Sequence, residues 1–228
     1  MEQNKMAAAA AVAMICLLGA PQTGGAASHA LLALVYGEDG GSIAEQLATA
    51  VVENDCVVKR MGPVLGEAGA INLDQPEQFI WLTCDQAVDL EAAGFAGLVN
   101  GPDRRPVLLV GRQTDFPEDD SASDYRNRAY ILKVSHFNND KPPRRRKDLE
   151  QIRNWTLDRK DRYRRESFMR VQAASGMETP DEAVLLFYDS PLHGERFREN
   201  NPDILEAIEA FNDAHLNDHT YYFAGAAQ

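Results

Sequence analysis

The sequence predicts an α+β fold in which a β-α-β-β-α-β order of elements occurs twice, at 28–116 and 128–228. The first observation is the pattern itself: in each part, short apolar runs of strand length alternate with segments of helical periodicity. The second observation is the linker at 117–127, PEDDSASDYRN, which is acidic, small and polar. The 228 residues suffice for two such units of about 100 residues each.

The first 27 residues have the pattern of a secretory signal peptide and are predicted to lie outside the fold. Lys5 supplies a charge, the apolar run at 6–18 follows, and GGAAS offers small residues for cleavage near Ala27. Thirteen apolar residues are fewer than the roughly 20 that a membrane-spanning helix needs. We therefore expect a periplasmic or secreted protein without stable membrane insertion after cleavage; a retained N-terminal helix is the alternative.

The first repeat is predicted to contain four strands and two helices. The first strand is apolar on both of its faces, so both faces should be covered. Ser42 and Glu45 form a capping box that opens the first helix, and Asp85 is a candidate cap for the second. In order, the elements are strand 29–37, helix 42–54, strands 56–61 and 78–84, a helix after 85 that ends before Asn100, and strand 105–112.

The second repeat follows the linker with the same order. Asn201 and Pro202 are predicted to cap and start its second helix, whose apolar stripe runs from Ile204 to His215. The elements are strand 128–137, a helix from about 142 to about 165 by its periodicity, strands 168–174 and 183–189, the helix from 202, and strand 219–226.

A β-α-β-β-α-β unit forms a ferredoxin-like antiparallel sheet with both helices on one face, which leaves the other face bare. Because the strands are apolar on both sides, we expect the two repeats to pack sheet to sheet. The tandem order over 29–226, with the strands AYILKVSHFNN and TYYFAGA, resembles the dimeric α/β-barrel superfamily, which includes antibiotic-biosynthesis monooxygenase-like and EthD-like domains. The resemblance implies a pseudo-dimeric α/β barrel around a pocket for a small aromatic, polyketide or haem-type ligand.

Two cysteines remain once the signal segment with Cys16 is removed. In a ferredoxin-like sheet the second and third strands are antiparallel neighbours, which places Cys56 opposite Cys84. An even pair in an oxidising compartment favours a disulfide.

The segment 141–170 is strongly basic, with twelve basic and five acidic residues, in a chain of net charge -12. Nucleic acid is disfavoured as a partner because the rest of the molecule would repel a polyanion. A solvated helix face, paired with acids such as Glu195, Glu199, Glu206 and Glu209, is the simplest interpretation. Guidance of an anionic ligand towards a pocket is the alternative.

Polar residues in otherwise apolar strands are candidates for the pocket lining. Lys133, Ser135, Arg170 and Gln172 are the ligand-binding candidates, with Arg112 and Lys59 or Arg60 as contributors from the first repeat. Such groups bind a carboxylate, phenolate or phosphate. The competing interpretation is that they lie near strand ends and reach water.

His136 is the candidate proton acceptor, or a haem ligand, because it ends a strand beside Asn138. Tyr222 is a candidate for orienting an aromatic ring, as are Tyr188 and Trp155, although such residues are more often core. No histidine pair has zinc-site spacing, so no metal is predicted, and serine-hydrolase, P-loop and dinucleotide fingerprints are absent from the sequence.

These observations predict an exported tandem barrel that binds a small anionic or aromatic organic ligand. They leave open whether it is an enzyme; the resemblance implies a cofactor-independent oxygenase, isomerase or cyclase. The alternatives are a non-catalytic envelope protein that uses its basic helix to bind an acidic partner or anionic lipid, and a haem-binding barrel.

Overall fold

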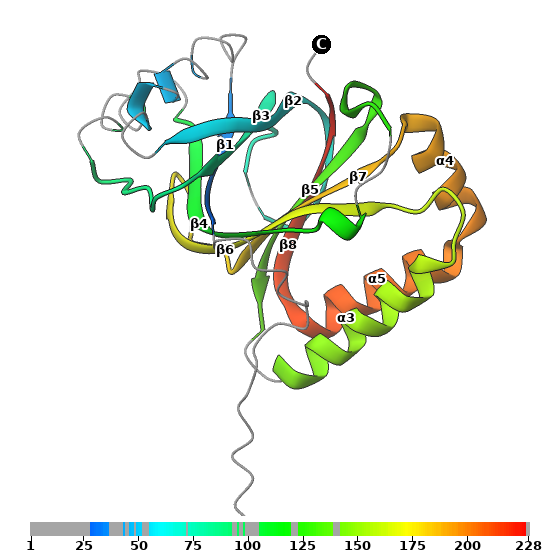
Figure 1. Ribbon diagram of the computed structural model, residues 1–228. Helices are drawn as coiled ribbons and strands as arrows, with labels where there is room; N and C mark the ends of the chain where they lie inside the picture. Colours follow the sequence, from blue (N-terminus) through cyan, green and yellow to red (C-terminus); the bar gives the residue numbers. More distant parts are fainter. Residues whose placement is uncertain are drawn as a thin grey trace, which may run out of the picture.

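A computed structural model describes residues 28–36, 55–71, 73–92, 105–119, 123–138 and 142–226, with positions 43, 46, 47, 49–51, 95 and 98. Eight antiparallel strands form one closed barrel in the order β1-β3-β2-β8-β5-β7-β6-β4 (Figure 1). The strands are β1 (Ser28–Val35), β2 (Cys56–Gly69), β3 (Gln78–Cys84), β4 (Val107–Asp115), β5 (Ala129–Phe137), β6 (Arg164–Ser175), β7 (Glu182–Tyr188) and β8 (Leu216–Gly225).

The two halves of the barrel have the same strand order, β4-β1-β3-β2 and β8-β5-β7-β6. They are joined edge to edge, since β2 pairs with β8 and β4 pairs with β6. The prediction of two separate sheets packed face to face is wrong in this respect. An open sheet edge leaves peptide groups unpaired, and closure into a barrel pairs them.

The β4/β6 seam depends on a glycine. A β-bulge separates Val110 from Gly111, where the backbone of β6 comes so close that a Cβ on Gly111 would lie 2.0 Å from the carbonyl oxygen of Arg170. Only a residue without a side chain permits this approach. The β4/β6 junction of the halves therefore requires glycine at this position.

Alternating residues of both halves meet inside the barrel and form one apolar core. Leu32, Trp81, Tyr130, Leu185 and Tyr222 are among its fully buried members. The opposite faces of the strands pack outward, in the first half against Leu47, Val51 and Phe95. Both faces are covered, as the doubly apolar strands predict.

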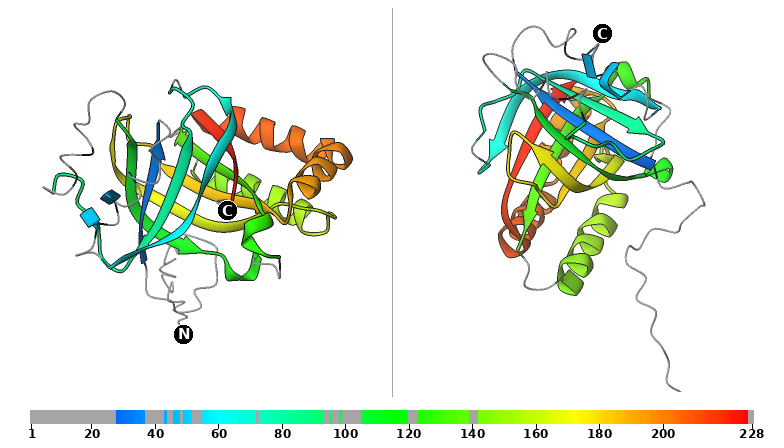
Figure 2. Two further views of the ribbon diagram at one scale, coloured as in Figure 1. Left: turned by 90° about the horizontal axis from the view of Figure 1, so that it is seen from above. Right: turned by 90° about the vertical axis from the view of Figure 1, so that its left-hand side faces the viewer.

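Three helices cover the outer face of the second half: α3 (Pro142–Leu157), α4 (Pro191–Asn200) and α5 (Pro202–His215) (Figure 2). The sequence predicts α5 closely but extends α3 into what is β6. It misses α4, whose ten residues include Gly194 and few apolar side chains; Ser190 caps this helix by accepting a hydrogen bond from the His193 amide.

The two helices predicted in the first repeat lie largely outside the described residues. Residues 85–92 are described and form turns, so the helix predicted to follow Asp85 does not begin there. The linker contains two 3-10 turns, Pro117–Asp119 and Tyr125–Asn127. Among the described residues, no helix is long and apolar enough to span a bilayer.

Candidate functional site

A buried charged cluster lies at the end of the barrel where β5 begins. Glu166 is 8% exposed; its Oε1 lies 2.7 Å from Nε of Arg60 on β2, and its Oε2 lies 3.3 Å from Nη1 of Arg128, the residue before β5. Glu166 reaches the cluster because the β6 register shifts between Arg165 and Ser167, and a bulge turns a side chain away from its regular direction.

Arg128 is the most buried cation of this cluster, at 4% exposure. Its guanidinium lies 3.9 Å from the centroid of the Phe187 ring, a cation-π contact. The Arg128 Nε also donates to Ser123 Oγ at 3.4 Å, and Ser123 Oγ donates to Asp189 Oδ1 at 2.8 Å. Arg128 is thus a buried cation held by several polar groups.

Tyr130 stands beside this cluster inside the barrel. Its ring packs edge-on against Phe79, with centroids 5.9 Å apart, and its buried hydroxyl makes no hydrogen bond of normal geometry with a described residue. Burial, followed by the charge of Glu166, raises the pKa of Tyr130 to about 12, although Arg60 and Arg128 oppose the rise. The hydroxyl therefore stays protonated at neutral pH and can donate a hydrogen bond.

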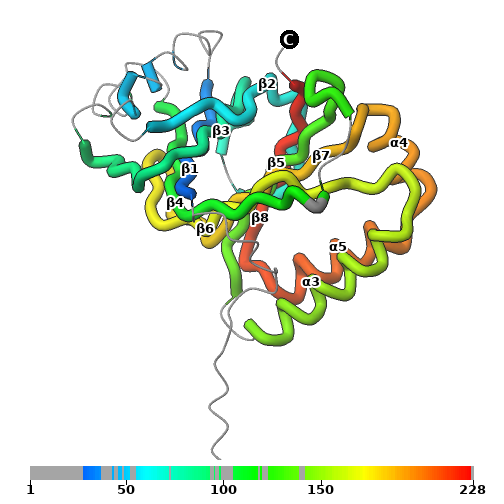
Figure 3. Tube along the Cα trace, viewed as in Figure 1, coloured from blue at the N-terminus to red at the C-terminus, as the bar shows by residue number. Residues whose placement is uncertain are grey.

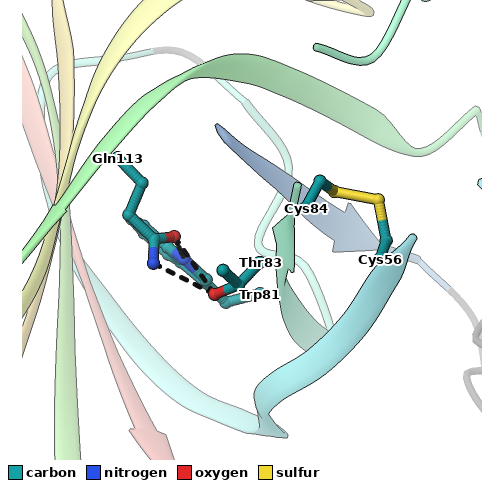
Figure 4. Close-up of a disulfide and its surroundings, with 5 residues drawn as sticks. All are labelled: Cys56, Trp81, Thr83, Cys84 and Gln113. Atoms are coloured by element: carbon teal, nitrogen blue, oxygen red, sulfur yellow. Dashed lines mark hydrogen bonds between the residues drawn. A yellow bond between two sulfur atoms is a disulfide. The ribbon is translucent and has the colours of Figure 1, made fainter. Parts of the chain in front are cut away.

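A second polar network, around Gln113 of β4, lies inside the first half (Figure 4). Trp81 Nε1 donates to Gln113 Oε1 at 2.7 Å, and Gln113 Nε2 donates to Thr83 Oγ1 at 3.0 Å and to Asp115 Oδ1 at 2.9 Å. Lys59 Nζ and Ser167 Oγ also donate to Asp115 Oδ1, at 2.6 and 2.8 Å. These mutual bonds satisfy the network internally, so it is a structural link between β3, β4 and β6.

A cavity of about 430 Å³ opens beside the charged cluster, between α4 and the strands β5 and β8. It holds two cations, Arg128 and Arg198, and one acid, Glu195, in an otherwise mostly apolar wall. The other lining residues are Leu65, Ala129, Tyr130, Ile131, Tyr188, Pro191, Gly194, Phe223, Ala224 and Gly225. A volume of this size suits a small organic molecule.

Gly194 shapes the helical wall of this cavity. A Cβ at this position would lie 2.9 Å from Cδ2 of the Tyr188 ring, so the glycine allows α4 to approach the end of β7. Tyr188, which the sequence marks as a candidate aromatic contact, lines the cavity as a result.

Two predicted ligand residues, Lys133 and Ser135, lie elsewhere. Both are buried on the outer face of β5, the face opposite to Tyr130, Leu132 and Val134, which belong to the barrel core. Lys133 Nζ donates to Asn212 Oδ1 of α5 at 3.1 Å and lies 5.5 Å from the Phe211 and Tyr221 ring centroids. Neither residue lines the cavity, because α5 covers the polar face of the strand, and their role as ligand residues stays a prediction.

Arg170 and Gln172 are exposed on the outer face of β6, and Met169 and Val171 point into the core instead. Neither lines the cavity. Tyr222 is fully buried in the barrel core, where burial raises its pKa. The six predicted catalytic and ligand residues are therefore not gathered into one site.

His136 lies at the opposite end of β5 from the cavity. Its Nδ1 contacts Oδ1 of Asp218 on β8, and its buried Nε2 has no hydrogen-bond partner among the described residues. His136 does not line the cavity, and its role as a proton acceptor stays a prediction. No cluster of three metal-ligating side chains occurs within the described part of the chain.

Cys56 and Cys84 are brought together as the sequence predicts. They are register partners on β2 and β3, with Cα atoms 4.0 Å apart, and their sulfur atoms are bonded in the structure (Figure 4). The bridge lies on the outer side of β3, away from Gln113. The bridge holds the first part of β2 against β3. This part has no pairing with β8, which begins to pair with β2 only at Val64.

At least five arginines in the described part of the basic segment form ion pairs with aspartates. Arg159 pairs with Asp203 at 2.5 Å, Arg165 with Asp119 at 2.5 Å, and Arg164 with Asp189 at 3.6 Å. These pairs fix the segment against neighbouring elements. They support the interpretation of a solvated, ion-paired face.

The closed antiparallel barrel with helices on its outside defines a dimeric α/β-barrel-like fold. A solved structure of an anthrone oxidase-like protein has this fold, with a TM-score of 0.55, 12% identity, and coverage of 89% of this chain and 92% of that chain. A protein from Lactobacillus acidophilus NCFM described as monooxygenase-type aligns with a TM-score of 0.47 at 11% identity, over 88% of this chain and 97% of that chain, which is too distant to support an argument. No family model and no curated protein matches the sequence.

Sequence reasoning named Arg60 only as a secondary candidate and missed Arg128, Glu166 and Tyr130. Arg128 and Tyr130 belong to a predicted strand, and their alternation with Ala129 placed them on one face. Alternation does not indicate which face of that strand lies inside the barrel. Glu166 left no signal, because the bulge that turns it inward is a tertiary feature.

Proposed function

We propose that the protein binds a small aromatic organic anion in the cavity between α4 and the strands β5 and β8. The observation that carries this proposal is the cavity of about 430 Å³ in which Arg128, Tyr130 and Arg198 meet an otherwise mostly apolar wall. Guanidinium groups bind carboxylates and phenolates through charge-assisted hydrogen bonds.

The oxygenase interpretation is a finer proposal that rests on this binding site. The fold shared with an anthrone oxidase-like protein suggests an oxidisable fused ring as the ligand. With anthrone, the balanced reaction would be anthrone plus O₂ giving anthraquinone plus water. The two arginines that line the cavity, Arg128 and Arg198, would favour the enolate, the form from which electrons pass to oxygen.

Binding is tested with two fluorescent probes of similar ring size, the anion 1-anilinonaphthalene-8-sulfonate and the neutral N-phenyl-1-naphthylamine. We expect saturable binding of the anion, with an affinity about 10-fold higher than for the neutral probe, since one charge-assisted hydrogen bond contributes about 1.5–3 kcal/mol. Equal affinity for both probes would contradict the charge selectivity, and binding of neither would contradict the cavity.

The location of the site is tested by filling the cavity. A Cβ on Gly225 would meet Pro63 and Leu65 at ordinary contact distances of 3.7 and 3.9 Å, so Gly225→Trp extends into the cavity without backbone strain. We expect it to abolish probe binding while Gly225→Ala retains it. Circular dichroism and the unfolding midpoint show that both variants are folded, and unchanged binding by a folded Gly225→Trp would place the probe elsewhere.

The contribution of Arg198, the exposed cation that lines the cavity, to ligand binding is tested with two variants on α4. Arg198→Gln removes a charge that lines the cavity, and Arg196→Gln removes an exposed charge of α4 that does not. Because Arg198 is exposed, we expect a loss of about 3–10-fold for the sulfonate and no change for the neutral probe, with Arg196→Gln as wild type. Equal losses from both variants would indicate a general charge effect.

Catalysis has its own test. Oxygen uptake and the absorbance of anthraquinone are followed with anthrone, comparing the wild type with Gly225→Trp. Acceleration by the wild type alone supports the oxygenase proposal. If the wild type does not accelerate anthrone oxidation but still binds the sulfonate, the site is a binding site and the oxygenase proposal is wrong.

Two further predictions stay proposals. Export would place the Cys56–Cys84 pair in an oxidising compartment; mass measurement of the native protein should show cleavage near Ala27 and no free thiol at these positions, and an uncleaved, alkylatable protein would contradict it. The repeated strand order supports an internal pseudo-dimer of two ferredoxin-like repeats. EthD-like character has no support beyond the fold.

The haem alternative is tested by the Soret absorbance of haem-supplemented protein. None of the described histidines lines the cavity, so a cavity-bound haem would lack a histidine ligand. His136 contacts Asp218 and His215 contacts Asp148. The small-molecule proposal is therefore preferred.

A further inference from the structure

The rim of the cavity differs between its two sides. The helical side, on α4, presents two exposed charged residues, Glu195 and Arg198. The strand side, on β2 and β8, presents two exposed apolar residues, Leu65 and Phe223, which are 73% and 37% exposed. The strands β5, β8 and β2 are neighbours in the barrel, and α4 lies on the outside of the second half (Figure 3). The cavity therefore has a charged edge and an apolar edge.

The apolar edge continues across three strands. Phe223 of β8 is the register partner of Ile131 on β5 and of Gly66 on β2, and Leu65 directly precedes Gly66. Large side chains at neighbouring register positions on one face of a sheet lie within contact distance of each other. Ile131, Phe223 and Leu65 all line the cavity, and we call these three residues the apolar lip.

Leu65 belongs to the lip because β2 is irregular at this position. The pairing of β2 with β8 shifts between Val64 and Gly66, so Leu65 is an extra residue in the ladder. Such a bulge changes the direction of a side chain. A Cβ on Gly225 would lie 3.9 Å from Cδ1 of Leu65, so the leucine reaches over the end of β8 that lines the cavity. A Cβ on Gly66 would meet no described atom within 4 Å, so the space beside the lip is open.

The apolar lip borders the same cavity as a buried cation. Arg128, at 4% exposure, lines the cavity away from water, whereas Leu65 and Phe223 line it at the surface. Single exposed apolar residues are common on proteins, but a group of them beside a cavity is typical of a ligand-binding surface. A ligand that pairs its charge with Arg128 and extends past the rim can cover the lip with its apolar part. Both apolar surfaces then leave water, which favours binding.

We propose that the apolar lip selects, among small organic anions, those that carry an apolar extension such as an alkyl chain. The inference rests on the proposed binding of an anion in the cavity and adds the form of that ligand, a charged ring with an apolar tail. Leu65 and Phe223 are the specificity-determining residues, because they contact the tail. The tail lies on the strand side since on the helical side it would remove water from Glu195 and Arg198.

A series of 4-alkylbenzenesulfonates, from ethyl to hexyl, tests the inference in titration calorimetry at concentrations below micelle formation. All members have the same ring and the same charge, so only the length of the tail changes. Full burial of a methylene group corresponds to about 4-fold in affinity, and the lip covers only one side of the tail. We therefore expect the wild type to gain about 2-fold per methylene, which is about 16-fold from ethyl to hexyl.

The double variant Leu65→Thr/Phe223→Thr removes the two apolar side chains and introduces residues that suit strands. Its gain from ethyl to hexyl should fall to about 3-fold, and Leu65→Thr alone should give an intermediate gain. The matched control is Val57→Thr, which changes a residue of the same strand that is 66% exposed and does not line the cavity. Its gain along the series should equal that of the wild type.

The outcomes separate this inference from the function on which it rests. A wild type that binds the ethyl compound without any gain along the series overturns the selectivity and leaves the cavity proposal standing. The selectivity is also overturned if the double variant keeps the full gain, or if Val57→Thr loses it to the same extent. A wild type that binds no member of the series overturns this inference, and the naphthalene sulfonate then decides the cavity proposal by itself.

Discussion

Two buried charged groups, one just before β5 and one within it, differ in what surrounds them. Arg128, the residue before β5, faces Glu166 and Phe187 at the barrel end and lines the cavity. Lys133, five residues later, faces α5 and is held by Asn212, Phe211 and Tyr221. Both are largely excluded from water, yet only the first borders open space.

The comparison shows that a buried charge marks a candidate site only when its partners leave room for a ligand. Burial lowers the pKa of Lys133, and Glu182 partly opposes this. Burial likewise raises the pKa of Glu182, although Lys133 lowers it. Each group is thus shifted towards its neutral form inside a closed contact, whereas Arg128 is paired with Glu166 and also lines the cavity.

The largest expected difference lies between the two glutamates. Glu166→Gln leaves Arg60 and Arg128 without their shared carboxylate, so we expect a loss of about 3 kcal/mol in the free energy of unfolding. Glu182→Gln removes a carboxylate that burial already disfavours, so the change should stay within about 1 kcal/mol. Urea unfolding at neutral pH measures both, and equal losses would show that the two environments are alike.

The two cations give the next largest difference. Arg128→Met should weaken binding of the naphthalene sulfonate by about 10-fold or more, because it removes the buried charge of the cavity wall. Lys133→Met should bind the probe as wild type, since Lys133 does not line the cavity and its ammonium group is held by Asn212 of α5. Weakened binding by the folded Lys133→Met would restore Lys133 as a ligand residue.

The smallest effect is a pH dependence of stability from Glu182. Burial raises the pKa of Glu182 in the folded state above 4.5, so the folded state binds this proton more tightly than the unfolded state. The stability that the protonated carboxyl provides is fully present below pH 4.5 and is lost as the pH rises through the folded pKa. Relative to wild type, Glu182→Gln should therefore gain stability from acid to neutral pH. If the free energy of unfolding had the same pH dependence in both proteins, Glu182 would not be desolvated.

The sequence predicts the strands well because their apolar pattern is local. It places β3 at its observed bounds, and β5 and β7 within one residue of theirs. It also pairs Cys56 with Cys84, since strand neighbours follow from the repeated order. It misses α4, where Gly194 and charged residues weaken the helical pattern.

The site residues were predicted less well for a physical reason. Alternation divides β5 into two faces and places Lys133 opposite Tyr130, but it cannot say which face the barrel encloses. Closure of β2 onto β8 and of β4 onto β6 made that choice. The polar face of β5 went beneath α5, and the apolar face went inside.

The sequence by itself determined the strands, their repeated order and the cysteine pair, because these depend on periodicity and neighbouring elements. Only the tertiary structure decided that Arg60, Arg128 and Glu166, from three distant segments, meet at one end of the barrel. The bulge that turns Glu166 inward and the closing seams depend on pairing between strands far apart in the chain. The local sequence pattern does not indicate which distant strands pair.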